Sequence, residues 1–110
     1  MKISEILKKK ATISFEVFPP KNKDGDISSI YHTIERLADL SPDFISVTYG
    51  AGGSSKGKTV EIAKMIKDRY GIESVAHLSC ITSTREDILK ECESLKEAGI
   101  DNILALRGDY

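Results

Sequence analysis

Polar residues stand at the ends of four apolar, strand-like runs, and these residues carry the candidate chemistry. They are Glu16, Thr48, His77 and the closing sequence Arg107-Gly108-Asp109. Carboxylate, hydroxyl, imidazole and guanidinium groups can move protons or bind a polar ligand. Because the carboxyl ends of parallel strands meet at one edge of a sheet, four such ends predict a single site.

Glu16 is the candidate proton donor, since it lies among Phe15, Val17 and Phe18. A carboxyl group in apolar surroundings has a raised pKa, which a general acid near neutral pH requires. A simpler interpretation competes, in which a glutamate at a strand end reaches solvent or pairs with a lysine such as Lys21. On spacing alone, the simpler interpretation is favoured.

The loosest stretch of backbone is residues 50–55, Gly-Ala-Gly-Gly-Ser-Ser. Its N–H groups could approach a ligand, and the helix expected to begin near Lys58 would add its dipole. The stretch matches neither the G-x-G-x-x-G fingerprint nor a phosphate-binding Walker loop. Glycine-rich loops are common between strands and helices, so this signal is weak. Thr48 and Tyr49, which precede the stretch, could be packing residues.

His77 stands alone in an apolar strand, and no second histidine, cysteine or acid at ligand spacing indicates a metal site. A hydrogen-bonded core histidine is the more common explanation. His32 lies off the apolar stripe of its helix and is expected at the surface. Gly108 would let the chain turn tightly and place Arg107 and Asp109 at the mouth of a site. The alternative is a plain ion pair that closes a loop.

Composition excludes several protein classes. The 110 residues form one domain or part of one, and 40% hydrophobic with 30% charged residues is typical of a globular chain. Sixteen basic against seventeen acidic residues argue against a nucleic-acid partner. No apolar run approaches the ~20 residues of a membrane span, and the N-terminus lacks the apolar segment of a signal peptide. Cys80 and Cys92 fit neither a disulfide framework nor a metal site, so we expect a cytoplasmic protein.

Hydrophobic periodicity predicts alternating strands and helices. Strands are predicted at residues 11–18, 44–49 and 74–80, with a fourth from about residue 102. A short helix is predicted from Ser4, and longer helices near residues 27–37, 58–70 and 84–98. A repeat of roughly thirty residues is typical of parallel βαβ units with right-handed crossovers. Three further signals mark helix ends: Gly71 and Gly99 as C-terminal caps, and Thr84 with Asp87 as a capping box.

Two α/β architectures fit this order: a small open sheet, or the first half of a (β/α)8 TIM barrel. The half-barrel is favoured, because one face of the strands grows more polar toward the carboxyl ends, where such barrels build active sites. An open sheet covered on both faces would be apolar on both. The predicted inner face comprises Ser14, Glu16, Ser46, Thr48, Val75, His77, Ser79, Ile103, Ala105 and Arg107. The predicted helix-covered face comprises Ile13, Phe15, Val17, Ile45, Val47, Leu104 and Leu106.

Four segments together carry a resemblance to a known family. They are residues 14–21 (SFEVFPPK), 46–54 (SVTYGAGGS), 76–80 (AHLSC) and 102–109 (NILALRGD). In this order and spacing, they closely resemble the N-terminal part of the methylenetetrahydrofolate reductase family. The resemblance covers nearly the whole chain, but only somewhat more than a third of a family catalytic domain. Residues 1–110 would then be a single domain, the N-terminal portion of an FAD-binding TIM barrel.

The resemblance implies a two-step reaction. NADH or NADPH would reduce FAD, and the flavin would pass a hydride to the folate substrate 5,10-methylenetetrahydrofolate, giving 5-methyltetrahydrofolate. Glu16 would be the general acid that protonates the folate and opens its five-membered ring to an iminium. Asp109 would lie near the flavin and also hold the folate pterin, and Thr48 would lie where nicotinamide and flavin meet. The remaining FAD contacts would be Tyr49, Ala51, His77, Arg107 and Gly108.

The sequence departs from the family pattern mainly by ending at Tyr110, so we expect a portion of a longer enzyme. Val17 stands where an aromatic residue is common, and Ser79 where threonine is common. A four-strand half-barrel would have two unpaired edges, so we expect a homo-oligomer, with no nucleic-acid or membrane partner. Two other interpretations stay open. One is an inactive half-barrel that self-associates without flavin; the other is a doubly wound module that binds a nucleotide where its strand order reverses.

Overall fold

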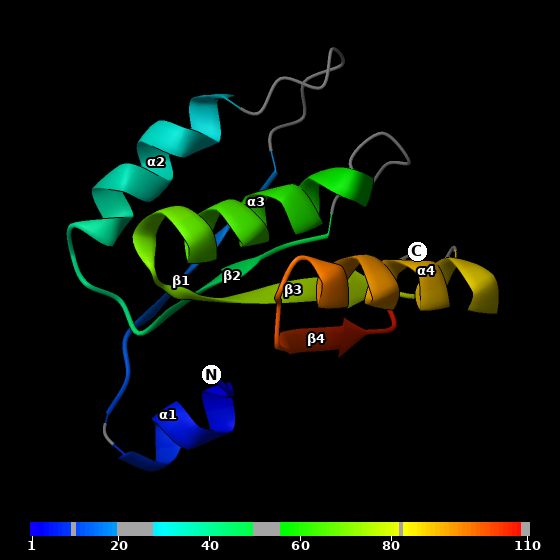
Figure 1. The fold of residues 1–110 in the computed structure, drawn as a ribbon, viewed down its shortest axis with the longest axis horizontal. Helices are drawn as coiled ribbons and strands as arrows, with labels where there is room; N and C mark the ends of the chain where they lie inside the picture. Colours follow the sequence, from blue (N-terminus) through cyan, green and yellow to red (C-terminus); the bar gives the residue numbers. More distant parts are fainter. Residues whose placement is uncertain (10, 20–27, 50–55, 82, 109–110) are drawn as a thin grey trace.

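The computed structural model describes residues 1–9, 11–19, 28–49, 56–81 and 83–108. Helices and strands alternate along this described part of the chain (Figure 1). The strands are β1 (Ser14–Val17), β2 (Phe44–Val47), β3 (Glu73–Ser79) and β4 (Asn102–Leu106). The helices are α1 (Ile3–Lys9), α2 (Ser28–Ala38), α3 (Lys56–Tyr70) and α4 (Arg85–Glu97).

The four strands form one parallel sheet in the order β1-β2-β3-β4. Each strand therefore pairs with the next one along the chain, and a helix provides each crossover. A doubly wound sheet would reverse its strand order at a switch point, and no reversal occurs in this sheet. The predicted α/β class is confirmed, and the sheet is consistent with the first half of a (β/α)8 barrel rather than with a doubly wound module.

One face of the sheet is covered by helices, and the core lies there. Ile34 from α2, Ile62 and Ile66 from α3, and Leu95 from α4 pack with the apolar side chains of the strands, and all four are almost completely buried. Figure 1 shows α2 and α3 on this side of the sheet and α1 on the other side. The strand residues buried under the helices are Val17, Ile45, Val47 and Ala76. The predicted helix-covered face is thus confirmed for Val17, Ile45 and Val47.

Ile13 and the whole of β4 depart from the predicted pattern of faces. Ile13 precedes β1 and is 63% exposed. In the ladder, His77 pairs with Leu104 and Ala76 with Ile103, so Leu104 shares the inner face and Ile103 does not. The prediction for β4 was wrong by one residue, which exchanges the two faces of the strand. The alternation that would place Arg107 on the inner face is therefore wrong as well.

Local signals at the helix ends are confirmed. The backbone N–H of Asp87 donates to Thr84 Oγ1, and that of Thr84 donates to Asp87 Oδ2, both at 3.1 Å, which forms the predicted capping box of α4. Gly71 and Gly99 follow α3 and α4 with φ of 65° and 78°, the left-handed conformation expected of C-terminal caps. These glycines end α3 and α4 shortly before β3 and β4 begin.

Candidate active site

Three neighbouring strands bring Glu16, Ser46 and His77 together on the face that α2, α3 and α4 leave open. Glu16 of β1 pairs directly with Ser46 of β2, and Ser46 pairs with Val75, two residues before His77 on β3. The Ser46 hydroxyl donates to Glu16 Oε1 at 3.3 Å, and His77 Nε2 lies 3.2 Å from the same oxygen. The predicted meeting of Glu16 and His77 is confirmed as a direct contact.

The two partners differ sharply in exposure. The His77 side chain is 9% exposed, whereas that of Glu16 is 49% exposed. The expected apolar surroundings of Glu16 are therefore wrong. Alternation turns Val17 onto the helix-covered face, and Phe18 is 65% exposed. Polar neighbours, rather than burial, set the environment of this carboxyl group.

His77 Nε2 is a buried nitrogen with an incomplete set of partners. Among the described residues it has no hydrogen-bond partner, although Glu16 Oε1 is within ion-pair distance. The two atoms are close but are not aligned as a hydrogen bond. A buried ring nitrogen in this state requires a partner, which a small rotation of Glu16 or a bound ligand would supply.

A cavity of about 520 Å³ extends along the open face from this cluster toward the starts of the strands. Glu16, Ser46 and His77 line it from the sheet, and Lys2, Ile3 and Ser4 line it from α1. Asp101 and Asn102, together with aliphatic and aromatic side chains of the strands, complete its walls. The candidate acid therefore borders a space with both apolar and polar walls, but this space leads toward the starts of the strands, whereas the predicted site lay at their carboxyl ends.

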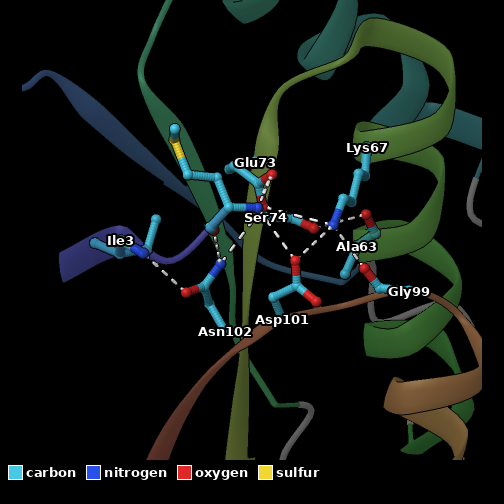
Figure 2. A network of polar contacts seen from close by, with 9 residues as sticks. Ile3, Ala63, Lys67, Glu73, Ser74, Gly99, Asp101 and Asn102 are labelled. Carbon is cyan, nitrogen blue, oxygen red and sulfur yellow. Dashed lines mark hydrogen bonds and ion pairs between the residues drawn. The ribbon is translucent and has the colours of Figure 1, made fainter. Parts of the chain in front are cut away.

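A polar network fixes α1 at the starts of β3 and β4 (Figure 2). The α-amino group of Met1 lies 2.6 Å from Glu73 Oε1 and 3.1 Å from Asp101 Oδ2. Asn102 donates to the Met1 carbonyl at 2.9 Å and accepts from the Ile3 N–H at 3.0 Å. These five residues join positions almost a full chain length apart, and the sequence analysis missed them.

Lys67 of α3 ties the same network to the helix-covered side. Its Nζ donates to the Gly99 carbonyl at 2.6 Å and to Asp101 Oδ2 at 3.2 Å. Hydrogen bonds, first to Glu73 and then to Asp101, raise the pKa of the Met1 α-amino group above its usual value. The hydrogen bonds from the Met1 α-amino group and then from Lys67 lower the pKa of Asp101.

Thr48 and Tyr49 follow β2, and their neighbours are residues of β1, α3 and α4. The Thr48 N–H donates to the Val17 carbonyl, and the Thr48 carbonyl accepts from Thr59 Oγ1, each at 3.0 Å. Burial, and then the negative charge of Glu91 on α4, raise the pKa of Tyr49. Tyr49 thus lies near α4.

Gly108 lies against the end of β3 with φ of 96°. A Cβ atom at this position would lie 2.2 Å from Ser79 Oγ and 3.0 Å from Ile81 Cγ2. The glycine is therefore required by the close approach of two strand ends, as well as by its backbone conformation. Arg107, beside it, is exposed.

Several predicted site residues lie outside the described part of the chain. They are Ala51, Asp109 and the remainder of the glycine-rich stretch at 50–55, together with Lys21, the alternative partner of Glu16. Within the described ranges, no group of three His, Cys, Asp or Glu residues could hold a metal ion. The helices described here include none that is long and apolar enough to cross a bilayer.

Comparison with known proteins places this geometry in context. The sequence profile of the family described as methylenetetrahydrofolate reductase matches residues 2–110. A 5,10-methylenetetrahydrofolate reductase from Pectobacterium carotovorum is 42% identical over 103 residues, which is 94% of this chain and 34% of that protein. The protein of the same name from Escherichia coli K12 is 41% identical over 97 residues, 88% of this chain and 32% of that protein.

A plant relative is longer. Methylenetetrahydrofolate reductase (NADH) 1 from Arabidopsis thaliana is 41% identical over 96 residues, 87% of this chain and 16% of that protein. The chain thus spans about a third of the length of its bacterial relatives and a smaller share of the plant relative.

Proposed function

Because the chain belongs to the methylenetetrahydrofolate reductase family, we propose that it is the N-terminal portion of an enzyme that reduces 5,10-methylenetetrahydrofolate to 5-methyltetrahydrofolate. FAD would be the cofactor and NADH or NADPH the electron donor. Residues 1–110 would form the first four strands of one barrel domain and the three helices that connect them. The observation that supports this proposal best is the carboxyl group of Glu16, which two neighbours hold at the edge of a cavity.

Glu16 would act as the general acid. Among the described residues, only its Oε1 atom takes part in a hydrogen bond or ion pair. A proton on Oε2 would therefore be available to a ligand on the open face of the sheet. Transfer of that proton to a ring nitrogen of the folate would let the carbon–nitrogen bond break, with the electron pair remaining on that nitrogen. The five-membered ring would open to an iminium, which is the hydride acceptor.

We propose that described residues at the strand ends hold the flavin. A buried imidazole nitrogen of His77 has no hydrogen-bond partner among them, and the exposed guanidinium of Arg107 suits a phosphate group. Gly108 packs against Ser79 and Ile81, and its backbone is proposed as a further flavin contact. When bound, the flavin would supply hydride transfer between nicotinamide and folate. Thr48, Tyr49, Ala51 and Asp109 are proposed as further contacts, with Asp109 also on the folate.

The electron donor is proposed from a relative's name. The Arabidopsis thaliana relative is named an NADH enzyme, so NADH is the first donor to test for this chain. NADPH stays the alternative donor.

A fusion protein tests the function. Residues 1–110 replace the matching segment of the Escherichia coli relative, which supplies the rest of the barrel. We expect the fusion to bind flavin, visible as yellow colour, and to reduce the folate substrate with NADH. A fusion that folds but takes up no flavin would contradict the proposed cofactor.

The variant Glu16→Gln separates the two steps in the same fusion. It should keep the reduction of flavin by NADH and lose the folate step, by roughly 100-fold or more, because a positioned acid contributes about 10²–10⁴-fold. Survival of both steps would show that Glu16 is not the acid.

A second proposal concerns the isolated chain, which we expect to form a homo-oligomer. The strands β1 and β4 are the two edges of the sheet. On β4, Ile103, Leu104 and Leu106 are each more than a third exposed. An unpaired, apolar edge of this kind favours pairing with another chain. Sedimentation across a range of concentrations tests this, and a monomer at the highest concentration would contradict it.

A further inference from the structure

We propose that Ser46 is a positioning residue for Glu16, a role that rests on the proposed function of Glu16 as an acid. Ser46 lies on the strand between Glu16 and His77, at the point where their side chains meet. Its small size leaves room for the contact between them, and its hydroxyl group adds a second hold on the same carboxylate oxygen.

The sheet geometry explains why size matters at this position. Glu16 is on β1 and His77 is on β3, so two strand spacings, roughly 9.5 Å, separate their strands, and His77 also lies two residues beyond Val75, the β3 residue in register with Glu16 and Ser46. The Glu16 Oε1 and His77 Nε2 atoms nevertheless lie 3.2 Å apart. The two side chains therefore reach toward each other over β2. Ser46 is the residue of β2 that is in register with Glu16 and faces the same side.

The hydroxyl group is the weaker part of the arrangement. The Ser46 Oγ to Glu16 Oε1 distance of 3.3 Å is longer than the 2.5–3.0 Å typical of O–H···O hydrogen bonds. A longer side chain at position 46 would instead occupy the space in which the carboxylate and imidazole meet. We therefore expect the size of residue 46 to matter more than its hydroxyl.

The consequence for the acid is an asymmetric carboxyl group. Ser46 and His77 both approach Oε1, so the contacts of this carboxyl group with the described residues are at that oxygen and leave Oε2 for a ligand. A side chain that is 49% exposed would otherwise sample several rotamers. Holding one oxygen restricts the other to the positions from which a proton can be delivered.

Nitrogen NMR of the histidine rings in the 110-residue chain tests the contact directly. The chain contains two histidines, and His32 is exposed on α2, so it serves as an internal reference. Glu16→Gln should shift the ring nitrogens of His77, because it removes the carboxylate. Ser46→Leu should shift them in the same direction and by a similar amount, while Ser46→Ala should have a much smaller effect. His32 should not shift in any variant.

Ser14→Leu is the matched control. Ser14 lies on β1, two residues before Glu16 and on the same face, but not between Glu16 and His77. It should leave the His77 spectrum unchanged. If Ser46→Leu fails to fold, Ser46→Val and Ser46→Thr provide the graded increase in size. The proposal is overturned if the ring-nitrogen chemical shifts of His77 are unchanged in Glu16→Gln. It is also overturned if they stay at the wild-type values when a larger residue is placed at position 46.

The fusion with the Escherichia coli relative then connects position to chemistry. Ser46→Leu should slow the folate step roughly 10- to 100-fold, since a displaced catalytic group loses about this much, and should leave flavin reduction within about twofold. Equal loss of both steps would indicate a general structural defect and would overturn the role. A fusion without flavin activity, in which the NMR result nevertheless holds, would refute the proposed function alone.

Discussion

The two faces of the sheet are built on different principles. On the helix-covered face, Ile45 and Val47 are fully buried beneath Ile34 and Ile66. On the open face, the polar side chains of Glu16 and Ser46 border a cavity, and Leu104 is 45% exposed. The difference indicates that one face stabilises the fold and the other is available for a ligand or for further strands. The side chains that stabilise the fold and those that could carry the chemistry thus lie on opposite faces of one sheet.

The largest expected effect is on stability, and it is measured by truncating one large apolar side chain on each face of the sheet. Ile45→Ala should lower the free energy of unfolding by about 2–5 kcal/mol, because it leaves a cavity in a fully packed core. Leu104→Ala, on the open face, should change it by less than about 0.5 kcal/mol. Urea denaturation followed by circular dichroism measures both. Equal losses would show that the open face is packed in solution, for example against a second chain.

The same contrast explains which faces could be predicted from the sequence. In β1 and in residues 45–47 of β2, polar and apolar residues alternate, so the helix-covered side could be predicted from the pattern, and Val17, Ile45 and Val47 were placed correctly. The segment Ile103-Leu104-Ala105-Leu106 is apolar throughout and carries no such signal. Its register depends on hydrogen bonds to β3, which sequence periodicity does not contain.

The candidate site was only partly predictable for related reasons. Glu16 and His77 stand out because a charged or imidazole side chain is uncommon in a strand. Ser46 was placed on the correct face but was not recognised as part of the site, because a serine in a strand is unremarkable by itself. The signal that would have found it is its register with Glu16. The contacts of Met1 and Asn102 depend on where α1 docks, and no local pattern encodes that.

A substitution at Gly108, beside the end of β3, should have an intermediate effect on the free energy of unfolding. Gly108→Ala should cost about 1–3 kcal/mol, because its φ of 96° disfavours a side chain and the new Cβ would overlap Ser79 Oγ. Gly99→Ala is the matched control, since it also has positive φ but no atom within 4 Å of the added Cβ. The excess cost at 108 over 99 measures the overlap.

A rescue variant makes this comparison specific. Ser79→Ala removes the oxygen that a side chain at 108 would meet. The double variant, Gly108→Ala with Ser79→Ala, should therefore recover part of the loss seen with Gly108→Ala alone. Unfolding measured for the four proteins of this cycle gives the coupling. A coupling near zero would mean that the strand ends separate freely and that the glycine serves only its backbone conformation.

The smallest expected effect concerns α1, which closes the cavity through surface charges rather than core packing. The pKa of the Met1 α-amino group is raised above its ordinary value of 8.0, so its contribution to docking is complete below pH 8 and is lost as the pH rises through the folded-state pKa. The pKa of Asp101 is lowered from 3.8, so its contribution is complete above that value and is lost as the pH falls through the lower folded-state pKa. Docking of α1 should therefore be strongest between about pH 4 and pH 8.

Hydrogen exchange of the Ile3 N–H, which donates to Asn102, reports this docking once the intrinsic pH dependence of exchange is removed. Protection should decline on both sides of the window, while the amide of Ile45 in the packed sheet stays protected throughout. Asp101→Asn should reduce the loss of protection at low pH and weaken docking at high pH, since it takes away one of the two carboxylate partners of the α-amino group and leaves Glu73. If Ile3 and Ile45 lost protection together at the same pH, α1 would be an integral part of the core, and the separation between the two faces would not extend to this helix.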